Sequence, residues 1–74
     1  MEVKVYSTKT CPYCVMVKDY LTSKSIAYQN FDVSQDAAAR EEMVKISGQM
    51  GVPVISIDGK IIIGFDKDKI DSFL

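Results

Sequence analysis

Residues 2–14 of the chain read EVKVYSTKTCPYC, and this stretch decides the fold because a strand pattern runs directly into a helix start. Apolar and polar residues alternate from Glu2 to Tyr6, which is typical of a strand with one buried face. After a polar connection, Pro12 favours the first helical position, where its missing N–H is not needed. Cys11 is therefore predicted to cap a helix that runs from about Pro12 to Ser23.

The remainder of the chain continues to alternate between strand and helix patterns. The further predicted elements are a strand over 26–33, a helix over 36–47 ended by Gly48, hairpin strands over 54–57 and 60–63, and a helix from about Asp66. The hairpin prediction rests on Asp58-Gly59, a pair that favours a tight turn between branched runs. On the last helix, Ile70, Phe73 and Leu74 are expected to be buried.

This order of elements predicts an α/β fold in a single domain, residues 1–74. A strand, a helix and a strand within about thirty residues form a parallel crossover unit. The following helix and antiparallel hairpin complete a four-stranded mixed sheet with helices on both faces, in the order βαβαββα.

The composition excludes several classes of protein. Hydrophobic residues make up 47% and charged residues 26% of the sequence, which is typical of a globular domain and too apolar for disorder. Nine basic against ten acidic residues give a net charge of −1, and the basic residues are scattered, so we expect no nucleic-acid partner. The sequence carries no pattern of a signal peptide or membrane segment, and we expect a cytoplasmic protein without a membrane partner.

The chain has two cysteines, Cys11 and Cys14, and no histidine. A disulfide across two residues would constrain the chain very little, and a structural zinc site would need two more ligands. The pattern favours redox chemistry; the alternatives are two buried thiols without chemistry and half of a metal site shared between chains. A helix N-terminus stabilises an anion, so Cys11 is the expected attacking thiolate, while Cys14 shares a buried stripe with Val17 and Leu21 and is the expected resolving thiol. Lys9 either adds positive potential or is a solvated loop lysine.

The segment Cys11-Pro12-Tyr13-Cys14 resembles the CPYC active-site motif of dithiol glutaredoxins, and the resemblance covers essentially the whole chain. It continues through Gly51-Val52-Pro53-Val54 and Ile63-Gly64-Phe65-Asp66, as in short bacterial glutaredoxin-like proteins. It implies a thioredoxin-like fold and a glutathione-dependent thiol-disulfide oxidoreductase with a redox-active Cys11–Cys14 disulfide. The implied partners are glutathione as co-substrate and disulfide-containing proteins. No tightly bound cofactor and no metal are expected, and we expect a monomer.

The resemblance also implies a glutathione site. Its residues would be Lys9, Tyr13, Val52, Pro53, Gly64, Phe65 and Asp66. The Val52–Pro53 turn would be cis and would offer the Val52 backbone to the cysteinyl part of glutathione, while the Gly64–Asp66 loop would hold the γ-glutamyl end by backbone N–H groups. The alternatives are a plain trans proline, an ordinary N-cap role for Asp66 and an exposed Tyr13 without a ligand.

Other functions remain open at this point. Gly64-Phe65-Asp66 also resembles the loop of small redoxins that serve ribonucleotide reductase and take electrons from thioredoxin reductase. Glutaredoxins often carry Thr where Gly51 stands and a second acid where Lys67 stands. A third interpretation is a module that binds an iron-sulfur cluster or another metal between two subunits through Cys11. Some relatives carry selenocysteine at the position of Cys11.

Overall fold

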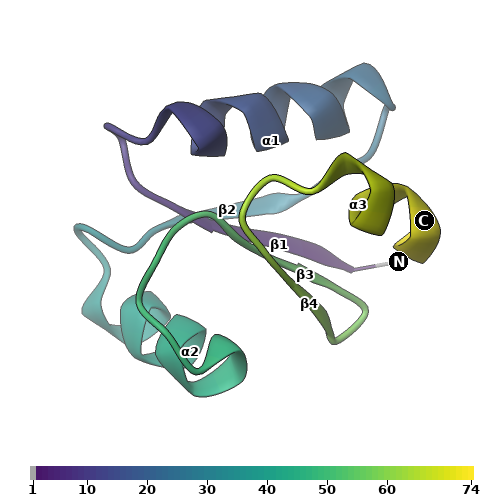
Figure 1. Ribbon diagram of the computed structural model, residues 1–74. Helices are drawn as coiled ribbons and strands as arrows, with labels where there is room; N and C mark the ends of the chain where they lie inside the picture. The colour runs from purple at the N-terminus through teal and green to yellow at the C-terminus, as the bar shows by residue number, and fades with distance from the viewer. Residues whose placement is uncertain (1) are drawn as a thin grey trace.

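A computed structural model describes residues 2–74 as a four-stranded sheet and three helices (Figure 1). The elements are β1 (Val3–Ser7), α1 (Pro12–Ser23), β2 (Gln29–Asp32), α2 (Ala37–Ser47), β3 (Val54–Ile57), β4 (Lys60–Ile63) and α3 (Lys67–Phe73). The strand order is β2-β1-β3-β4, with β1 parallel to β2 and antiparallel to β3, and β3 antiparallel to β4. The predicted thioredoxin-like fold with a mixed sheet is confirmed.

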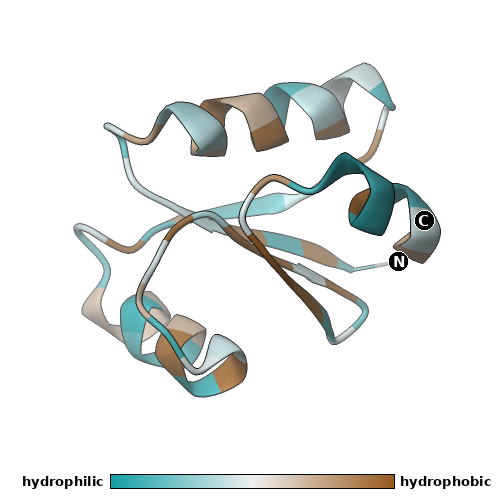
Figure 2. Ribbon diagram, viewed as in Figure 1, coloured by the Kyte–Doolittle hydropathy of each residue, from teal (hydrophilic) through white to brown (hydrophobic). Residues whose placement is uncertain are grey.

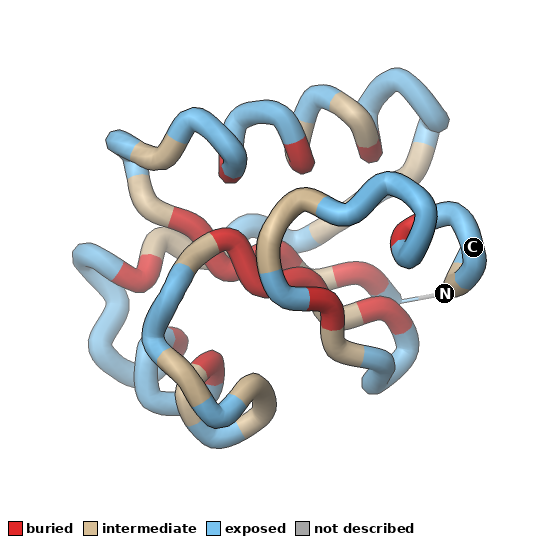
Figure 3. The backbone as a smooth tube through the Cα atoms, viewed as in Figure 1, coloured by how far each residue is buried: buried red, intermediate tan, exposed pale blue. Residues whose placement is uncertain are grey.

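The helices cover both faces of the sheet. Helices α1 and α3 lie on one face, and α2 lies on the other (Figure 1). Two apolar clusters result, one on each face, and the central strands lie between them. The apolar stretches of the chain accordingly gather in the strands and on the inward sides of the helices (Figure 2), and so do the buried positions (Figure 3).

This arrangement corrects the sequence prediction for β1, which is buried on both faces. Val5 packs in the cluster under α1 and α3, as the alternating pattern predicts. Tyr6, however, points to the opposite face and is also 0% exposed, because Met43 of α2 packs against it there. Alternation along one strand shows which residues share a face but not whether a distant helix covers the second face.

Several predicted boundaries also change. Strand β2 covers only Gln29–Asp32, because these are the residues that pair with β1, although Ile26 and Tyr28 still pack against the core from the preceding loop. Helix α2 begins at Ala37, after Asp36 has capped it by accepting a hydrogen bond from the Ala39 amide (3.0 Å).

The hairpin turn agrees with its sequence prediction, and the last helix agrees in part. Asp58 and Gly59 have φ angles of 50° and 86°, as a two-residue hairpin turn of this class requires. In α3, Ile70 is fully buried and Phe73 is partly buried, as predicted. The prediction for Leu74 is wrong, because this residue follows the helix and its side chain is 42% exposed.

Candidate active site

Cys11 is the N-cap of α1. Its backbone is extended (φ −97°, ψ 110°), and the helix begins at the next residue, Pro12. The Cys11 sulfur accepts a hydrogen bond from the backbone amide of Cys14 over 3.3 Å, so a first-turn N–H group points at it. A helix N-terminus and an amide donor both favour an anion at this position. Cys11 is partly exposed, so its sulfur is accessible to a substrate.

Cys14 has a very different environment one turn later. Its side chain is 0% exposed and belongs to the buried stripe that also contains Val17 and Leu21. Burial, followed by the hydrogen bond with Cys11, raises the pKa of Cys14 to about 11, and the backbone of Thr8 acts in the opposite direction. At neutral pH Cys14 is therefore a protonated thiol beneath the exposed sulfur.

The loop before β3 lies directly beside the cysteines. The Val52–Pro53 peptide bond is cis, as the family resemblance implied, and Pro53 is buried. The Cys11 thiol lies 3.9 Å from the Val52 carbonyl oxygen, in hydrogen-bond geometry for sulfur. Among residues 2–74, the Val52 amide has no hydrogen-bond partner. An unpaired backbone amide and a weakly bonded carbonyl are therefore available next to Cys11.

An open groove of about 740 Å3 begins at this loop. The sequence-predicted residues that line it are Tyr13, Val52, Pro53, Gly64, Phe65 and Asp66. They come from three distant parts of the chain, namely the first turn of α1, the loop before β3 and the connection from β4 to α3. Since the Val52 carbonyl contacts the Cys11 thiol, the groove opens beside the exposed cysteine.

The wall formed by the β4–α3 connection is held in place from both sides. Gly64 has a φ of 82°, which favours glycine, and its amide donates to the Pro53 carbonyl over 2.9 Å. The Phe65 ring packs edge-on against Tyr20 of α1, with ring centroids 5.9 Å apart. Asp66 caps α3 by accepting a hydrogen bond from the Lys69 amide (3.1 Å), so its ordinary structural role is occupied without any ligand.

Lys9 is the predicted site residue that the structure does not place along the groove. It is exposed in the loop before α1 and is absent from the groove lining. Its charge acts instead on Asp32 at the end of β2. The pKa of Asp32 is lowered, mainly by its hydrogen bond with the Ser34 side chain and further by the charges of Lys9 and Lys18.

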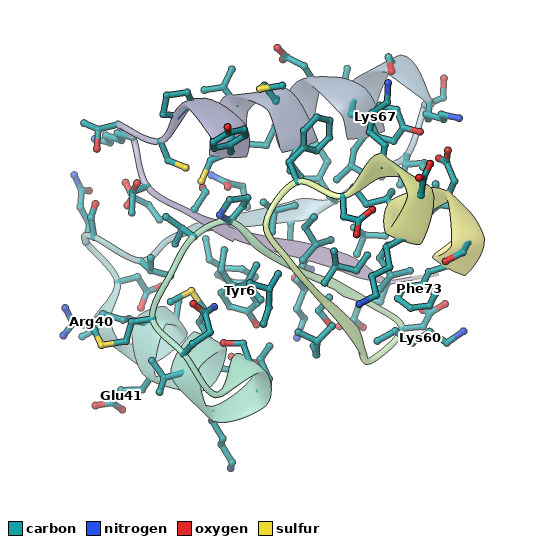
Figure 4. All side chains as sticks on the ribbon, in the orientation of Figure 1. Tyr6, Arg40, Glu41, Lys60, Lys67 and Phe73 are labelled. Atoms are coloured by element: carbon teal, nitrogen blue, oxygen red, sulfur yellow. The ribbon has the colours of Figure 1, made fainter. Side chains whose placement is uncertain are left out.

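The groove is also lined by three residues that sequence reasoning did not assign to the site: Ile63, Lys67 and Asp68. Ile63, at the end of β4, is a large apolar residue whose side chain is 54% exposed, so it is not part of the buried core. Lys67 extends from the start of α3 towards α1 (Figure 4). Its Nζ lies 5.2 Å from the centre of the Tyr20 ring. The groove therefore carries a cation as well as two carboxylates.

Within residues 2–74, no group of three or more His, Cys, Asp or Glu side chains is placed to hold a metal ion. In the same part of the chain, no helix is both long and apolar enough to cross a membrane.

Comparison with known proteins places this geometry in a family. The family model described as Glutaredoxin matches residues 3–62. An uncharacterised glutaredoxin-like 8.6 kDa protein of the rubredoxin operon in Clostridium pasteurianum is 51% identical over 72 residues, covering 97% of this chain and 96% of that protein. Glutaredoxin 3 of Escherichia coli is 45% identical over 64 residues, covering 86% of this chain and 77% of the relative.

Solved structures agree with the sequence relatives. The structure of a thioredoxin-like protein superposes with a TM-score of 0.93 at 37% identity, covering 99% of this chain and all of the other. A buckwheat glutaredoxin in complex with glutathione superposes with a TM-score of 0.79 at 29% identity, covering 97% of this chain and 71% of the other. The chain therefore belongs to the glutaredoxin family, whose membership implies thiol-disulfide oxidoreductase activity.

Proposed function

We propose that the protein reduces protein disulfides and glutathione mixed disulfides, with Cys11 as the nucleophile, Cys14 as the resolving thiol and glutathione as the electron donor. The observation that carries the proposal is the unequal pair at the start of α1. An accessible sulfur receives an amide hydrogen bond, and a fully buried thiol lies one turn behind it.

In the first step, the Cys11 thiolate attacks one sulfur of the substrate disulfide. A Cys11–substrate disulfide forms, the substrate S–S bond breaks, and the second substrate sulfur leaves as a thiolate that takes up a proton. The partial exposure of Cys11 permits the approach, and the groove beside it accommodates the rest of the substrate.

In the second step, Cys14 loses its proton and attacks the Cys11 sulfur. The Cys11–Cys14 disulfide forms, and the remaining substrate thiolate leaves. Part of the raised pKa of Cys14 is due to its hydrogen bond and charge interaction with Cys11. Once Cys11 is in a neutral mixed disulfide, these two influences disappear, and the pKa of Cys14 falls towards the value that burial alone sets. Formation of the mixed disulfide thereby favours its own resolution.

The groove supports glutathione as a ligand of this site. The unpaired amide and the carbonyl of Val52 match the backbone of a cysteinyl residue, which can pair with them as a short strand. Tyr13 and the segment Gly64–Asp66 form the two sides of the same groove. The related buckwheat glutaredoxin was solved as a glutathione complex, which supports this ligand class for the chain.

A coupled assay tests the electron donor. Oxidised protein is supplied with glutathione, glutathione reductase and NADPH, and consumption of NADPH is followed with a disulfide substrate. We expect turnover with this system. A protein that is active with dithiothreitol but inactive with glutathione would contradict the proposed donor while leaving the thiol chemistry intact.

Thioredoxin reductase is the second candidate donor, and the observation that favours it is the cation at the groove. Lys67 occupies the first position of α3 and lines the groove between Asp66 and Asp68. Parallel measurement of both donors on the same oxidised protein separates the two candidates. Failure of thioredoxin reductase to reduce the Cys11–Cys14 disulfide would eliminate the second.

A further inference from the structure

The loop that carries Val52 is held by a side chain of its own, that of Gln49. Its amide group makes two hydrogen bonds to the backbone of Gly51: Nε2 donates to the Gly51 carbonyl over 3.0 Å, and Oε1 accepts from the Gly51 amide over 2.5 Å. The Gln49 side chain thus occupies both backbone groups of Gly51, as a neighbouring strand would.

Gln49 is itself anchored to the end of α2. The Ser47 hydroxyl donates to the Met43 carbonyl over 2.6 Å and accepts from the Gln49 backbone amide over 3.4 Å. Gly48 ends the helix with a φ of 73°, so the chain turns sharply before Gln49. A continuous series of contacts therefore runs from α2 through Gln49 and Gly51 to the neighbour of Gly51, Val52.

The absence of a side chain at position 51 is part of this arrangement. A Cβ atom built on Gly51 would lie 2.6 Å from Gln49 Oε1 and 3.7 Å from Gln49 Cδ, with no other atom in its way. The φ of Gly51 is not positive, so the backbone does not itself require glycine. A side chain at this position would instead push the Gln49 amide away from the Gly51 backbone, so glycine permits the two hydrogen bonds.

We infer that Gln49 is a positioning residue for substrate binding, which acts by holding the Gly51–Val52 backbone in the geometry that pairs with a peptide next to the reacting disulfide. The inference rests on the proposed function, in which the Val52 backbone pairs with the substrate. The loop before β3 is exposed, and its Met50 side chain is 68% exposed. Without the Gln49 contacts, fewer hydrogen bonds hold this loop in one conformation.

The experiment compares two disulfides that differ in whether they have a peptide backbone. Reduced protein is mixed with an excess of oxidised glutathione or of 2-hydroxyethyl disulfide. The reaction is quenched with acid, and the second-order rate constant for oxidation of the protein is determined. The variants are Gln49→Ala, Gly51→Ala and the double substitution. Gln29→Ala is the matched control, an exposed glutamine on the edge strand β2 at the opposite end of the sheet.

In Gln49→Ala, we expect the rate constant with oxidised glutathione to fall about three- to tenfold, as loss of two hydrogen bonds predicts, and that with 2-hydroxyethyl disulfide to stay within about twofold. Gly51→Ala should have the same effect, because its Cβ displaces the same side chain. The double variant should be no slower than either single variant, since both remove one contact. Amide hydrogen exchange of Gly51 should accelerate in Gln49→Ala and stay unchanged in Gln29→Ala.

Each contrary result has a distinct meaning. Equal slowing with both disulfides would overturn the inference, because Gln49 would then act on the cysteines themselves. Multiplying effects in the double variant would overturn it as well, because the two residues would act independently. A wild-type protein that reacts with oxidised glutathione no faster than with 2-hydroxyethyl disulfide would instead contradict the proposed peptide groove, and the role of Gln49 with it.

Discussion

The Cys14 backbone amide donates a hydrogen bond to the Cys11 sulfur, while the Cys14 side chain is completely buried beneath it. One residue thus stabilises the attacking sulfur through its backbone and supplies the resolving thiol through its side chain. A substitution at position 14 that keeps the backbone in place should therefore remove the second function and leave the first.

Exchanging each cysteine for serine tests this division. We expect Cys11→Ser to lose all exchange activity, because a serine hydroxyl is not ionised at neutral pH. Cys14→Ser should keep part of the activity towards glutathione mixed disulfides, because a second glutathione can resolve them, and should lose reduction of protein disulfides. The two activities are measured separately on a glutathionylated peptide and a protein disulfide. Equal loss of both activities in the two variants would contradict the assigned roles.

The raised pKa of Cys14 predicts that the reduced protein loses stability in alkali. Folding raises this pKa from its ordinary value of 9.0 to about 11, so between these values the unfolded chain has released a proton that the folded chain still holds. The unfolded state then binds fewer protons, and the free energy of unfolding falls as pH rises from about 9 to about 11, by at most about 2 kcal/mol.

Urea unfolding at pH 8, 9 and 10 under reducing conditions measures this change. Cys14→Ala removes the titrating group and should flatten the decline, although it lowers stability at every pH by leaving a small cavity. The oxidised protein, whose Cys14 sulfur carries no proton, serves as the control. The same slope in the reduced and oxidised forms would show that Cys14 does not cause the decline.

Much of this fold could be predicted because its signals are local. Pro12 after a polar loop, Asp58-Gly59 between branched runs and Gly48 after an amphipathic segment each fix one boundary through the conformation of one or two residues. The length of β2 was not predictable in this way, because it depends on which residues find partners on β1. Burial of Tyr6 similarly depends on α2, which lies far along the chain.

For the candidate site too, features with a local sequence signal were predictable and features that depend on distant contacts were not. Cys11 and Cys14 could be assigned roles from their places in one helical turn, and motif resemblance drew attention to Val52, Pro53 and the Gly64–Asp66 loop. The contacts of Gln49 with Gly51 had no sequence signal, because they depend on the path of an irregular loop. Lys9 shows the opposite case, in which closeness to Cys11 in sequence did not bring the side chain to the groove.

The buried hydroxyl of Tyr6 predicts a substitution that stabilises the protein. Within residues 2–74 the hydroxyl of Tyr6 (Figure 4) has no hydrogen-bond partner. The Tyr6 ring stacks on that of Phe31, with ring centroids 5.3 Å apart. The nearby Glu42 pairs with Lys4 at 3.8 Å. Tyr6→Phe keeps the ring and removes the unpaired polar group, so we expect the free energy of unfolding to rise by about 1 kcal/mol.

Denaturant unfolding of Tyr6→Phe near pH 7 measures this effect. Phe31→Leu removes the ring that stacks on Tyr6 and serves as a comparison in which packing is lost. Burial and the Glu42 carboxylate raise the pKa of Tyr6 from 10.0 to about 12, so the wild-type protein loses additional stability above pH 10. The advantage of Tyr6→Phe should grow over that range. A variant less stable than wild type at pH 7 would show that the hydroxyl is satisfied in solution, by the nearby Glu42 carboxylate or by water.

The polar contacts between α1 and α3 predict which substitution should make the groove wall more mobile. The Tyr20 hydroxyl donates a hydrogen bond to the Asp71 carboxylate, and Lys24 Nζ lies 3.5 Å from the same carboxylate. The Tyr20 hydrogen bond is the main cause of the lowered pKa of Asp71. This stabilisation is therefore present at neutral pH and is lost as pH falls through the lowered pKa of Asp71.

Asp71→Asn should imitate that loss at neutral pH. Because α3 is short and its first residues form the groove wall, we expect faster backbone amide exchange over Lys67–Phe73, measured by mass spectrometry, while exchange over Ala37–Ser47 on the other face stays unchanged. Asp19→Asn, an exposed carboxylate on α1, is the matched control and should leave both helices unchanged. Faster exchange in both α2 and α3 of Asp71→Asn would contradict this prediction. It would mean that global stability has fallen, because a contact between α1 and α3 does not act directly on α2 on the other face of the sheet.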